Sequence, residues 1–434
     1  MPINPSNMRV VDVARLLNST SFGFVLAQAR LYREFNRVGF RIGSSENPRN
    51  INLLKYIAWM FDRKHTPEET SGARSYEERR NAERDRQAEQ SLAGRDIGPL
   101  PEVVNPGRKA ACERNFQLFC ESYFPETYAL AWSPDHLKVI EKIETAVLRG
   151  GLFALALPRG SGKTTITESA ALWSMLYGHR EFVVLIGATE SAALELLDSL
   201  KTELEVNERL AEDFPEVCYP VAQLEGIANR CAGQLCKGER TRITWTSNEI
   251  VLPTVEGSRA SGIIVRVAGI TGRIRGMKFK RSDGRSVRPS LVIIDDPQTS
   301  ESAGSLEQTR KRVRVLAGDI LGLAGPGQKI SGIMPCTIIR PGDMADIILN
   351  RNTHPDWNGE KTRMVYRFPT NMKLWEEYAE IRAEALRTEG NFQKATEFYL
   401  ANREAMDAGA EVSWEARFNH DEVSALQHAM NLKF

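Results

Sequence analysis

The chain has 434 residues, which at about 150 residues per domain suggests about three structural units. Hydrophobic residues make up 42% of the sequence and charged residues 26%, so a wholly disordered or fibrous protein is excluded. The 57 Lys and Arg residues against 56 Asp and Glu residues leave a net charge of +1, which excludes a protein that is strongly basic throughout but allows a local basic channel.

Cysteine usage and hydropathy indicate the compartment in which the chain works. The six cysteines are spread from residue 112 to residue 336, which is typical of thiols in a reducing compartment rather than of a disulfide scaffold. The first residues lack the basic segment followed by an apolar one that marks a signal peptide. Apolar runs reach only about eight residues, far short of the ~20 that cross a bilayer. We therefore expect a soluble intracellular protein.

Residues 1–65 are predicted to form a helical N-terminal domain, and residues 66–110 a charged linker. Three segments of the first region have apolar side chains at helical spacing: 11–17, 24–35 and 51–63. Gly39 and Gly43 are expected to separate the second and third of these helices. Residues 77–89 contain no large apolar side chain, so this run cannot bury a face and is expected to be a solvated helix or a disordered tether.

Residues 111–354 have the pattern of an α/β domain. Five apolar runs of strand length alternate there with amphipathic helical segments: 153–157, 182–186, 263–267, 291–294 and 330–334. Such alternation is typical of a mainly parallel sheet buried on both faces. A hairpin is expected over residues 242–252. Residues 355–434 are predicted to form a helical lid or linker subdomain, because apolar side chains recur at helical spacing between 370 and 408.

A glycine-rich loop between the run 153–157 and the next predicted helix is the most specific motif. Its residues are Pro158, Arg159, Gly160, Ser161, Gly162, Lys163, Thr164 and Thr165. Gly160 and Gly162 let successive backbone N–H groups turn towards a polyphosphate, and the helix N-terminus adds a partial positive charge. Lys163 is placed to reach the β- and γ-phosphates, and the Thr164 hydroxyl to ligate Mg²⁺. The loop therefore predicts a binding site for ATP and Mg²⁺.

Leu157, just before the loop, and Arg159, inside it, are the two distinctive residues of this segment. Leu157 stands where the usual phosphate-loop pattern has its first glycine. Arg159 could stabilise charge on the γ-phosphoryl group in cis, as an arginine finger does, or it could be a surface arginine paired with a nearby acid. The residue types leave both roles of Arg159 open.

The apolar run 291–294 leads into two carboxylates, Asp295 and Asp296. A buried parallel strand presents its carboxyl end to the ligand crevice, so Asp295 is expected to hold Mg²⁺ and Asp296 to orient and deprotonate the attacking water. Pro297 cannot donate to a sheet and is expected to end the strand. After the next strand, Thr337 is a candidate contact to the γ-phosphate that would couple hydrolysis to movement, with a role as a helix or turn cap as the alternative.

A basic loop lies between these motifs. Arg273, Arg275, Lys278 and Lys280 stand among three glycines in residues 269–280. Such a loop could contact phosphates of DNA or of a neighbouring subunit's nucleotide, or it could be a solvated surface loop.

In these motifs the chain resembles the large terminase subunit of tailed bacteriophages, the motor that packages DNA into capsids. The resemblance covers about residues 115–434. It rests on segments at 119–125, 132–136, 158–165, 186–193, 269–276, 288–297, 336–343 and 398–414. The arginine inside the loop and the missing first glycine are habits of that family. Its second acid is often Glu, so Asp296 is one methylene shorter than usual.

The resemblance implies a P-loop ATPase of the RecA/ASCE-like type that hydrolyses ATP to translocate double-stranded DNA into a procapsid. It adds His136 to the residues expected to bind ATP, and it makes Thr337 part of the family's coupling motif. It also implies a homo-oligomeric ring, a portal protein and a small terminase subunit as partners, and the host cell cytoplasm as the location.

Other interpretations stay open at this stage. The chain could be a helicase-like or recombination ATPase, or a non-catalytic, nucleotide-gated DNA-binding scaffold. Family members carry a ribonuclease-H-like nuclease domain, but only about twenty residues follow residue 414, so we expect no nuclease activity from this chain. Residues 1–65 lie outside the resemblance and could form a helix-turn-helix module or a plain docking domain.

Overall fold

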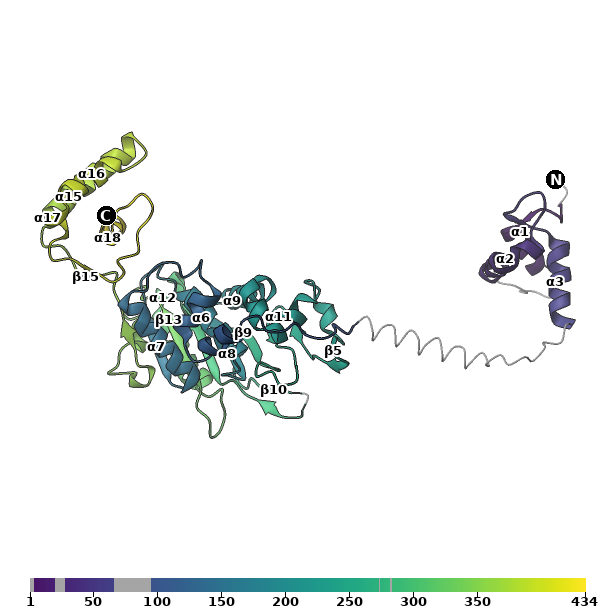
Figure 1. The fold of residues 1–434 in the computed structure, drawn as a ribbon, viewed down its shortest axis with the longest axis horizontal. Helices are drawn as coiled ribbons and strands as arrows, with labels where there is room; N and C mark the ends of the chain where they lie inside the picture. Colours follow the sequence, from purple (N-terminus) through teal and green to yellow (C-terminus); the bar gives the residue numbers. More distant parts are fainter. Residues whose placement is uncertain (1–3, 20–27, 66–94, 273, 282) are drawn as a thin grey trace. The chain divides into compact units, whose positions relative to one another are not determined.

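A computed structural model describes residues 4–19, 28–65, 95–272, 274–281 and 283–434 (Figure 1). The chain divides into two compact units, Met1–Gln87 and Ala88–Phe434. None of the helices in the described ranges combines the length and the apolar character that crossing a membrane requires.

Unit 1 is a small helical domain, as the apolar spacing predicts. Its elements are β1 (Met8–Arg9), α1 (Val10–Asn18), α2 (Gln28–Ile42), β2 (Asn50–Ile51) and α3 (Leu53–His65). β1 and β2 pair antiparallel, and the helices enclose a core that includes Val13, Leu31 and Tyr56. Residues 24–27 of the predicted second helix lie outside the described residues.

The second helix of unit 1 is interrupted beside Gly39, where the sequence predicted a break. α2 spans Gln28–Ile42, but the non-helical angles of Val38 (φ −131°, ψ 24°) divide it at a kink. Leu31, Phe35, Val38 and Ile42 contact the core of unit 1 on both sides of that kink. Gly43 follows the end of α2, and α3 begins only at Leu53, so the second and third helices are separate as predicted.

Unit 2 is an α/β domain built on one large sheet. Eight strands of the described chain form it, in the order β14 (Glu360–Lys361), β3 (Leu152–Ala156), β13 (Ser331–Cys336), β12 (Leu291–Asp295), β4 (Phe182–Gly187), β9 (Ile264–Gly269), β8 (Glu249–Val251) and β7 (Thr244–Trp245). The strands from β14 to β9 run parallel. The predicted hairpin is β7–β8, which extends the sheet antiparallel at one edge. The mainly parallel α/β fold is thus confirmed.

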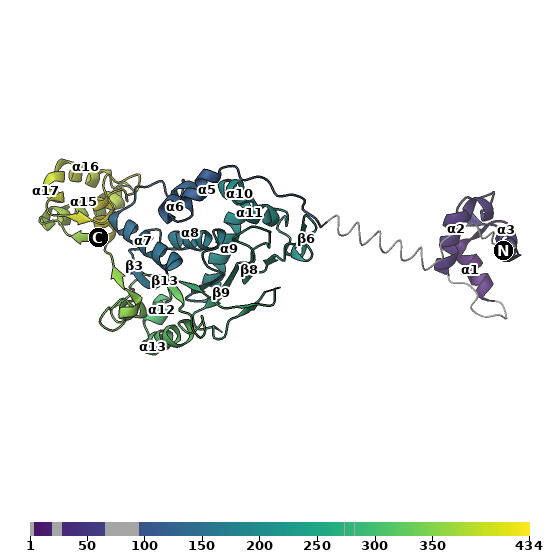
Figure 2. The ribbon, with the colours of Figure 1, turned by 60° about the horizontal axis from the view of Figure 1, so that its bottom comes forward.

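Helices cover both faces of this sheet (Figure 2). Alternate residues of a strand point to opposite faces, so Val183 and Leu185 of β4 enter one core while Val184 and Ile186 enter the other. The first core lies under α6 (Phe116–Tyr123), α7 (Pro134–Leu148), α8 (Lys163–Leu176), α9 (Glu190–Val206), α10 (Glu208–Asp213) and α11 (Pro215–Ala222). The second lies under α13 (Leu306–Val315), the π-helical turn η2 (Leu316–Ile320), α14 (Met344–Ile348) and η3 (Pro355–Trp357), and the short helix α12 (Ser300–Ala303) precedes α13.

The end of the predicted linker belongs to unit 2. Ile97 N–H donates to the Leu235 carbonyl, and the Arg108 guanidinium donates to the buried carboxylate of Asp213 (2.6 Å). Arg108 lies in α5 (Pro106–Cys112), within the range predicted as linker. Residues 66–94 of that range lie outside the described residues. Unit 2 also contains several short elements: η1 (Ala228–Cys231), β5 (Leu235–Cys236), β6 (Glu239–Arg240), β10 (Phe279–Lys280) and β11 (Ser286–Val287).

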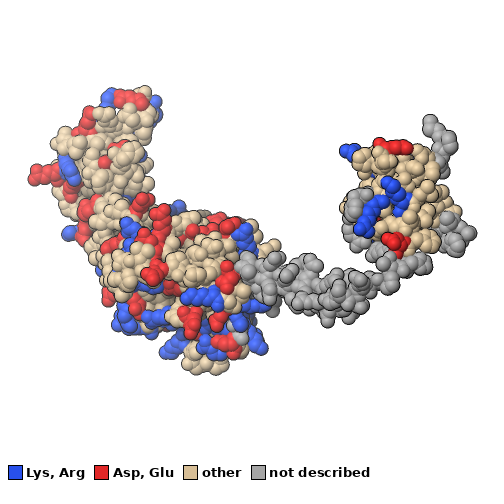
Figure 3. All heavy atoms as spheres, turned by 45° about the vertical axis from the view of Figure 1, so that its right-hand side comes forward, with Lys and Arg blue, Asp and Glu red and all other residues tan. Residues whose placement is uncertain are grey.

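The C-terminal lobe, residues 365–434, is largely helical, as predicted. It contains β15 (Val365–Arg367), α15 (Met372–Thr388), α16 (Gln393–Ala401), α17 (Arg403–Asp407), β16 (Glu411–Val412) and α18 (Ala425–Lys433). Its core is aromatic and includes Trp375, Tyr378 and Tyr399. On the face of unit 2 shown in Figure 3, Lys and Arg side chains are interspersed with Asp and Glu, in keeping with the net charge of +1.

Candidate nucleotide site

The glycine-rich loop connects β3 to α8, as the motif requires. Gly160 and Gly162 have φ angles of 70° and 72°, a left-handed conformation that side chains other than glycine's rarely adopt. α8 begins at Lys163, so Lys163 and Thr164 lie in its first turn. Leu157, at the position of the missing first glycine, is buried in the core. The loop therefore has the backbone of a phosphate cradle although its first residue serves packing.

Lys163 and Thr337 contact each other across the site. Lys163 Nζ donates to Thr337 Oγ1 (2.7 Å), and the Asp296 Oδ2 atom lies 3.8 Å from the same ammonium group. The strand order explains this contact, because β13 lies between β3 and β12. Thr337, directly after β13, therefore meets both the loop lysine and the acid pair. The structure brings together residues that are 174 positions apart.

Asp295 lies at the end of β12 and accepts a hydrogen bond from Thr164 Oγ1 on its Oδ2 atom (3.0 Å). Its Oδ1 atom is buried and has no hydrogen-bond partner among the described residues. Burial, and secondarily the neighbouring Asp296 carboxylate, raises the pKa of Asp295 to about 6. An unpartnered carboxylate oxygen beside a hydroxyl is a donor set that suits Mg²⁺, which prefers oxygen ligands. The two residues predicted to hold the metal therefore fit it.

Asp296 has an unusual backbone, with a φ angle of 35°. Its N–H donates to the Pro335 carbonyl, and its Oδ1 atom accepts from the Thr337 N–H (2.7 Å). These bonds hold a left-handed conformation that is uncommon outside glycine, though Asp and Asn tolerate it best. The Asp296 side chain is 44% exposed, so its second oxygen remains accessible to a water molecule.

His136 supports the loop from α7. Its Nε2 atom lies 3.0 Å from the Ser161 carbonyl oxygen, and its Nδ1 atom contacts the Ser133 cap of α7. Burial lowers the pKa of His136, which favours a neutral ring that donates from Nε2 to the carbonyl. His136 is thus placed against the loop's backbone. The Ser161 hydroxyl closes the loop internally by donating to the Pro158 carbonyl (2.7 Å).

The side chain of Arg159 extends into solvent, and its backbone carbonyl contacts a distant arginine. Its side chain is exposed, and its carbonyl accepts a hydrogen bond from Arg417 Nη2 (2.6 Å). Arg417 lies 258 residues further along the chain and was not among the predicted site residues. No local pattern marks it, because an isolated arginine three residues after Trp414 matches no spacing rule.

A second acid on α8 lies near the pair. Glu168 is half-buried, and burial raises its pKa to about 7, with the Asp295 charge adding to the effect. Glu301 on α12 is exposed. Both are alternatives to Asp296 as the group that activates water, and of the two only Glu168 interacts electrostatically with Asp295.

The basic loop after β9 is tied to unit 2 by an ion pair. Arg275 pairs with Asp319 of η2, yet its side chain stays 80% exposed. Lys278 and Lys280 are exposed as well, and Arg273 lies outside the described residues. The loop borders a cavity of about 370 Å³ that Glu190 also lines. Arg275 is therefore accessible to a partner's phosphate, and nothing brings it to the Lys163 cluster.

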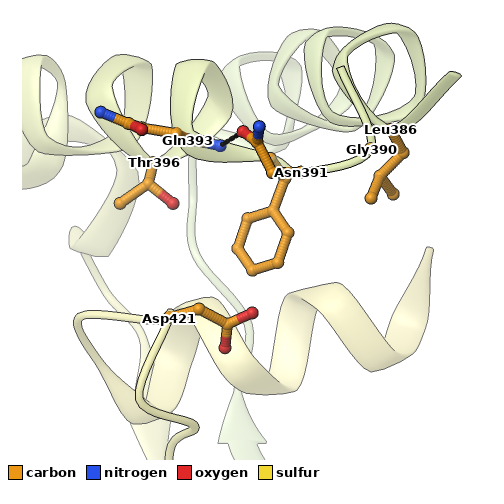
Figure 4. Close-up of a pocket in the computed structure, with 7 residues that line it drawn as sticks. Leu386, Gly390, Asn391, Gln393, Thr396 and Asp421 are labelled. Carbon is orange, nitrogen blue, oxygen red and sulfur yellow. Dashed lines mark hydrogen bonds between the residues drawn. The ribbon is translucent and has the colours of Figure 1, made fainter. Parts of the chain in front are cut away.

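Further cavities lie in unit 2, and two of them adjoin the C-terminal lobe or lie within it. One, of about 520 Å³, lies at the start of α7, and Trp132, Asp135, Tyr366 and Trp414 are among the residues that line it. The other, of about 500 Å³, lies in the C-terminal lobe, where Asp421 faces the turn between α15 and α16 (Figure 4). The side chain of Asn391 in that turn accepts a hydrogen bond from the Gln393 N–H (3.0 Å).

Comparisons with known proteins identify no relative of the chain, so any function must be argued from the geometry of the site. No protein-family model matches the chain, and no curated protein matches it. Among the described residues, no cluster of three or more His, Cys, Asp or Glu side chains could hold a metal ion by itself. Metal binding at Thr164 and Asp295 therefore needs further oxygens, such as those of a bound polyphosphate.

Proposed function

We propose that this chain is the ATP-hydrolysing motor subunit of a viral terminase, which translocates double-stranded DNA into a procapsid. The observation that carries the ATPase part is the cluster of Lys163, Thr337 and Asp296 beside the pair Thr164 and Asp295. It lies at the carboxyl ends of β3, β13 and β12, where α/β folds bind ligands. The parallel strand order, with β13 between the loop strand and the acidic strand, supports a core of the RecA/ASCE-like P-loop type.

The chemistry follows from the position of each group. Backbone N–H groups of the loop and the N-terminus of α8 would bind the polyphosphate, and Lys163 would exchange its bond to Thr337 for the terminal phosphates. Thr164 and Asp295 would hold Mg²⁺, which supplies charge neutralisation at the phosphates when it is bound.

Asp296 is the proposed general base. Its Oδ1 atom is held by the Thr337 N–H, which leaves Oδ2 to accept a proton from the attacking water. The same threonine contacts Lys163 through its hydroxyl. Loss of the γ-phosphate would therefore change both contacts of Thr337, in keeping with a coupling role for that residue.

The motor part of the proposal rests on the resemblance and on where its segments meet. His136 contacts Ser161, Thr164 contacts Asp295, Lys163 contacts Thr337, and Trp414 packs on His136. Segments that carry the resemblance thus converge on one site. By the same resemblance we propose a homo-oligomeric ring on a portal protein, a small terminase subunit as partner, and action in the cytoplasm of the host cell.

Steady-state ATP hydrolysis with and without double-stranded DNA tests the proposal. Wild-type protein should hydrolyse ATP in a Mg²⁺-dependent manner, and DNA should stimulate it. Lys163→Ala should reduce turnover to background while the circular dichroism spectrum and melting temperature stay unchanged. Lys373→Ala, which removes an exposed lysine of α15, is the matched control and should retain full activity.

The alternative functions predict different results. Turnover within twofold of wild type in Lys163→Ala would remove the ATPase assignment. ATP binding without any turnover in the wild type would favour a nucleotide-gated scaffold. ATP-dependent separation of a forked duplex into single strands would favour a helicase-like enzyme over a translocase that keeps the duplex intact.

A further inference from the structure

A segment of the C-terminal lobe lies directly against the phosphate loop. We name residues 413–417 the strap. Trp414 Nε1 donates to the Ala131 carbonyl (2.7 Å), and the Trp414 ring meets the His136 ring edge to face, with 4.5 Å between centroids. Arg417 Nη2 donates to the Arg159 carbonyl (2.6 Å). The strap thus contacts the loop once through His136 and once directly.

The environment of Arg417 is unusual for an arginine. It is half-buried, it forms no ion pair with a carboxylate of the described residues, and burial lowers its pKa. A β-carbon at Gly160 would come within 2.7 Å of Arg417 Nη2, so the guanidinium lies directly against the backbone of the loop there. A half-buried cation that donates to a neutral carbonyl and pairs with no carboxylate of the described residues has its charge incompletely compensated.

A polyphosphate in the loop would supply the missing charge. A guanidinium and a phosphate carry opposite charges and can form two parallel hydrogen bonds, whereas a carbonyl offers the guanidinium no negative charge. The guanidinium already lies at Gly160, in the loop that would wrap the phosphates. We propose that Arg417 binds the polyphosphate of ATP in cis, so that the strap transmits the state of the nucleotide to the C-terminal lobe. This inference rests on the proposed ATP site and assigns it a residue from outside the α/β core.

The strap is firmly joined to the lobe, which makes it suited to transmission. Immediately before it, β16 pairs with β15, and Tyr366 of β15 donates to Asp135 of α7 (2.7 Å). Beyond it, Glu422 contacts His428 of α18 (2.7 Å). If Arg417 moved from the loop carbonyl to a phosphate, the strap would therefore pull on β16 at one end and on the segment that contacts α18 at the other.

Binding of fluorescent nucleotides by the full-length chain tests the role of Arg417. Arg417→Ala should weaken the affinity for N-methylanthraniloyl-ATP about tenfold or more, the scale of a lost hydrogen bond to a charged group. The affinity for the corresponding AMP analogue, which lacks the β- and γ-phosphates, should stay within twofold. Arg387→Ala, an exposed arginine of α15 in the same lobe, is the matched control and should bind both analogues like wild type.

A merely structural role would lower both affinities equally, and that outcome, or unchanged binding of both analogues, would overturn the inference. Arg417→Lys keeps the charge but not the two-pronged geometry, so it should lie between alanine and wild type. If the alanine variant does not fold, Arg417→Gln replaces it. Failure of the inference is distinct from failure of the proposed function, because Lys163→Ala would still abolish ATP hydrolysis in the first case and not in the second.

Amide hydrogen exchange gives a second, independent measurement. A non-hydrolysable ATP analogue should slow exchange in residues 413–424 of the wild type and not in Arg417→Ala. Protection of these residues in both proteins would show that another group connects the strap to the nucleotide, and the inference would be wrong.

Discussion

Asp296 combines a strained backbone with a solvent-accessible carboxylate, and the two can be separated by mutation. Asp296→Asn keeps an oxygen for the Thr337 N–H and tolerates the left-handed φ of 35°. It lacks the negative charge that accepts a proton. We expect ATP binding close to wild type and hydrolysis at least ~100-fold slower, the scale of a lost general base.

Asp356→Asn, at an exposed position of η3, is the control for the charge change. Asp296→Ala should lose the contact to Thr337 as well, so it should lower both turnover and melting temperature. Normal hydrolysis by Asp296→Asn would assign the base elsewhere, with Glu168 and then Glu301 as the next residues to replace.

Because the pKa of Asp295 is raised, we expect both the stability of the fold and the proposed binding of Mg²⁺ to depend on pH. In the nucleotide-free fold this pKa is about 6, above its ordinary value of 3.8, so the folded state binds the proton more tightly than the unfolded chain. Its stabilising contribution is present below pH 4 and is lost as the pH rises to about 6. Mg²⁺ needs the carboxylate, so the affinity for Mg–ATP should rise over the same window.

Urea unfolding and nucleotide titrations between pH 4 and pH 8 measure both effects. Asp295→Asn should remove the pH step near 6 in each. A step near 7 belongs to Glu168, whose pKa is raised to about 7, and should disappear in Glu168→Gln instead. A step near 6 that survives in Asp295→Asn would contradict the assignment.

At the scale of elements, the basic loop after β9 is held by an ion pair while its described cationic side chains stay exposed to solvent. The ion pair of Arg275 with Asp319 fixes the loop to η2, while Lys278 stays exposed. If DNA is its partner, Arg275→Ala with Lys278→Ala should weaken duplex binding and reduce the salt dependence by one or two phosphate contacts. Basal ATP hydrolysis should survive, because neither side chain contacts the Lys163 cluster.

Fluorescence anisotropy of a labelled duplex over a range of salt concentrations measures this prediction. Arg387→Ala with Lys373→Ala removes two exposed cations of α15 and is the matched control. Unchanged DNA affinity, together with ATP hydrolysis that no longer rises with protein concentration, would instead point to a neighbouring subunit's nucleotide as the partner.

Helices and strands were largely predictable because their signals are local. The apolar runs of β4 and β12, the glycines of the loop and the aromatic spacing of α15 each lie within a few residues of one another. The break predicted at Gly39 corresponds to the kink at Val38 inside α2. The prediction missed the helical stretch that follows the kink, where Ile42 is buried in the core of unit 1. Propensity is a weak preference that burial in a core can override.

At the scale of the whole molecule, the proposed nucleotide site is formed by α7, the glycine-rich loop, two strand ends and the strap. Residue type and spacing indicated Lys163, Thr164, Asp295, Asp296 and Thr337, because phosphate and metal chemistry requires these groups after strands. Their mutual contacts depend on the strand order, in which β13 lies between β3 and β12. Strand order is decided by pairing between distant segments, which leaves no local trace.

The sequence by itself thus determined the parallel α/β core, the loop with its lysine, the acid pair and the largely helical C-terminal lobe. Only the tertiary structure decided that Thr337 joins Lys163 to Asp296, that Arg275 pairs with Asp319, and that Arg417 lies on the phosphate loop. The physical reason is the difference in sequence separation between local signals and tertiary contacts. Periodicity and motif spacing act within one or two turns or strands, whereas a guanidinium 258 residues away reaches the loop only once the sheet and the lobe have packed.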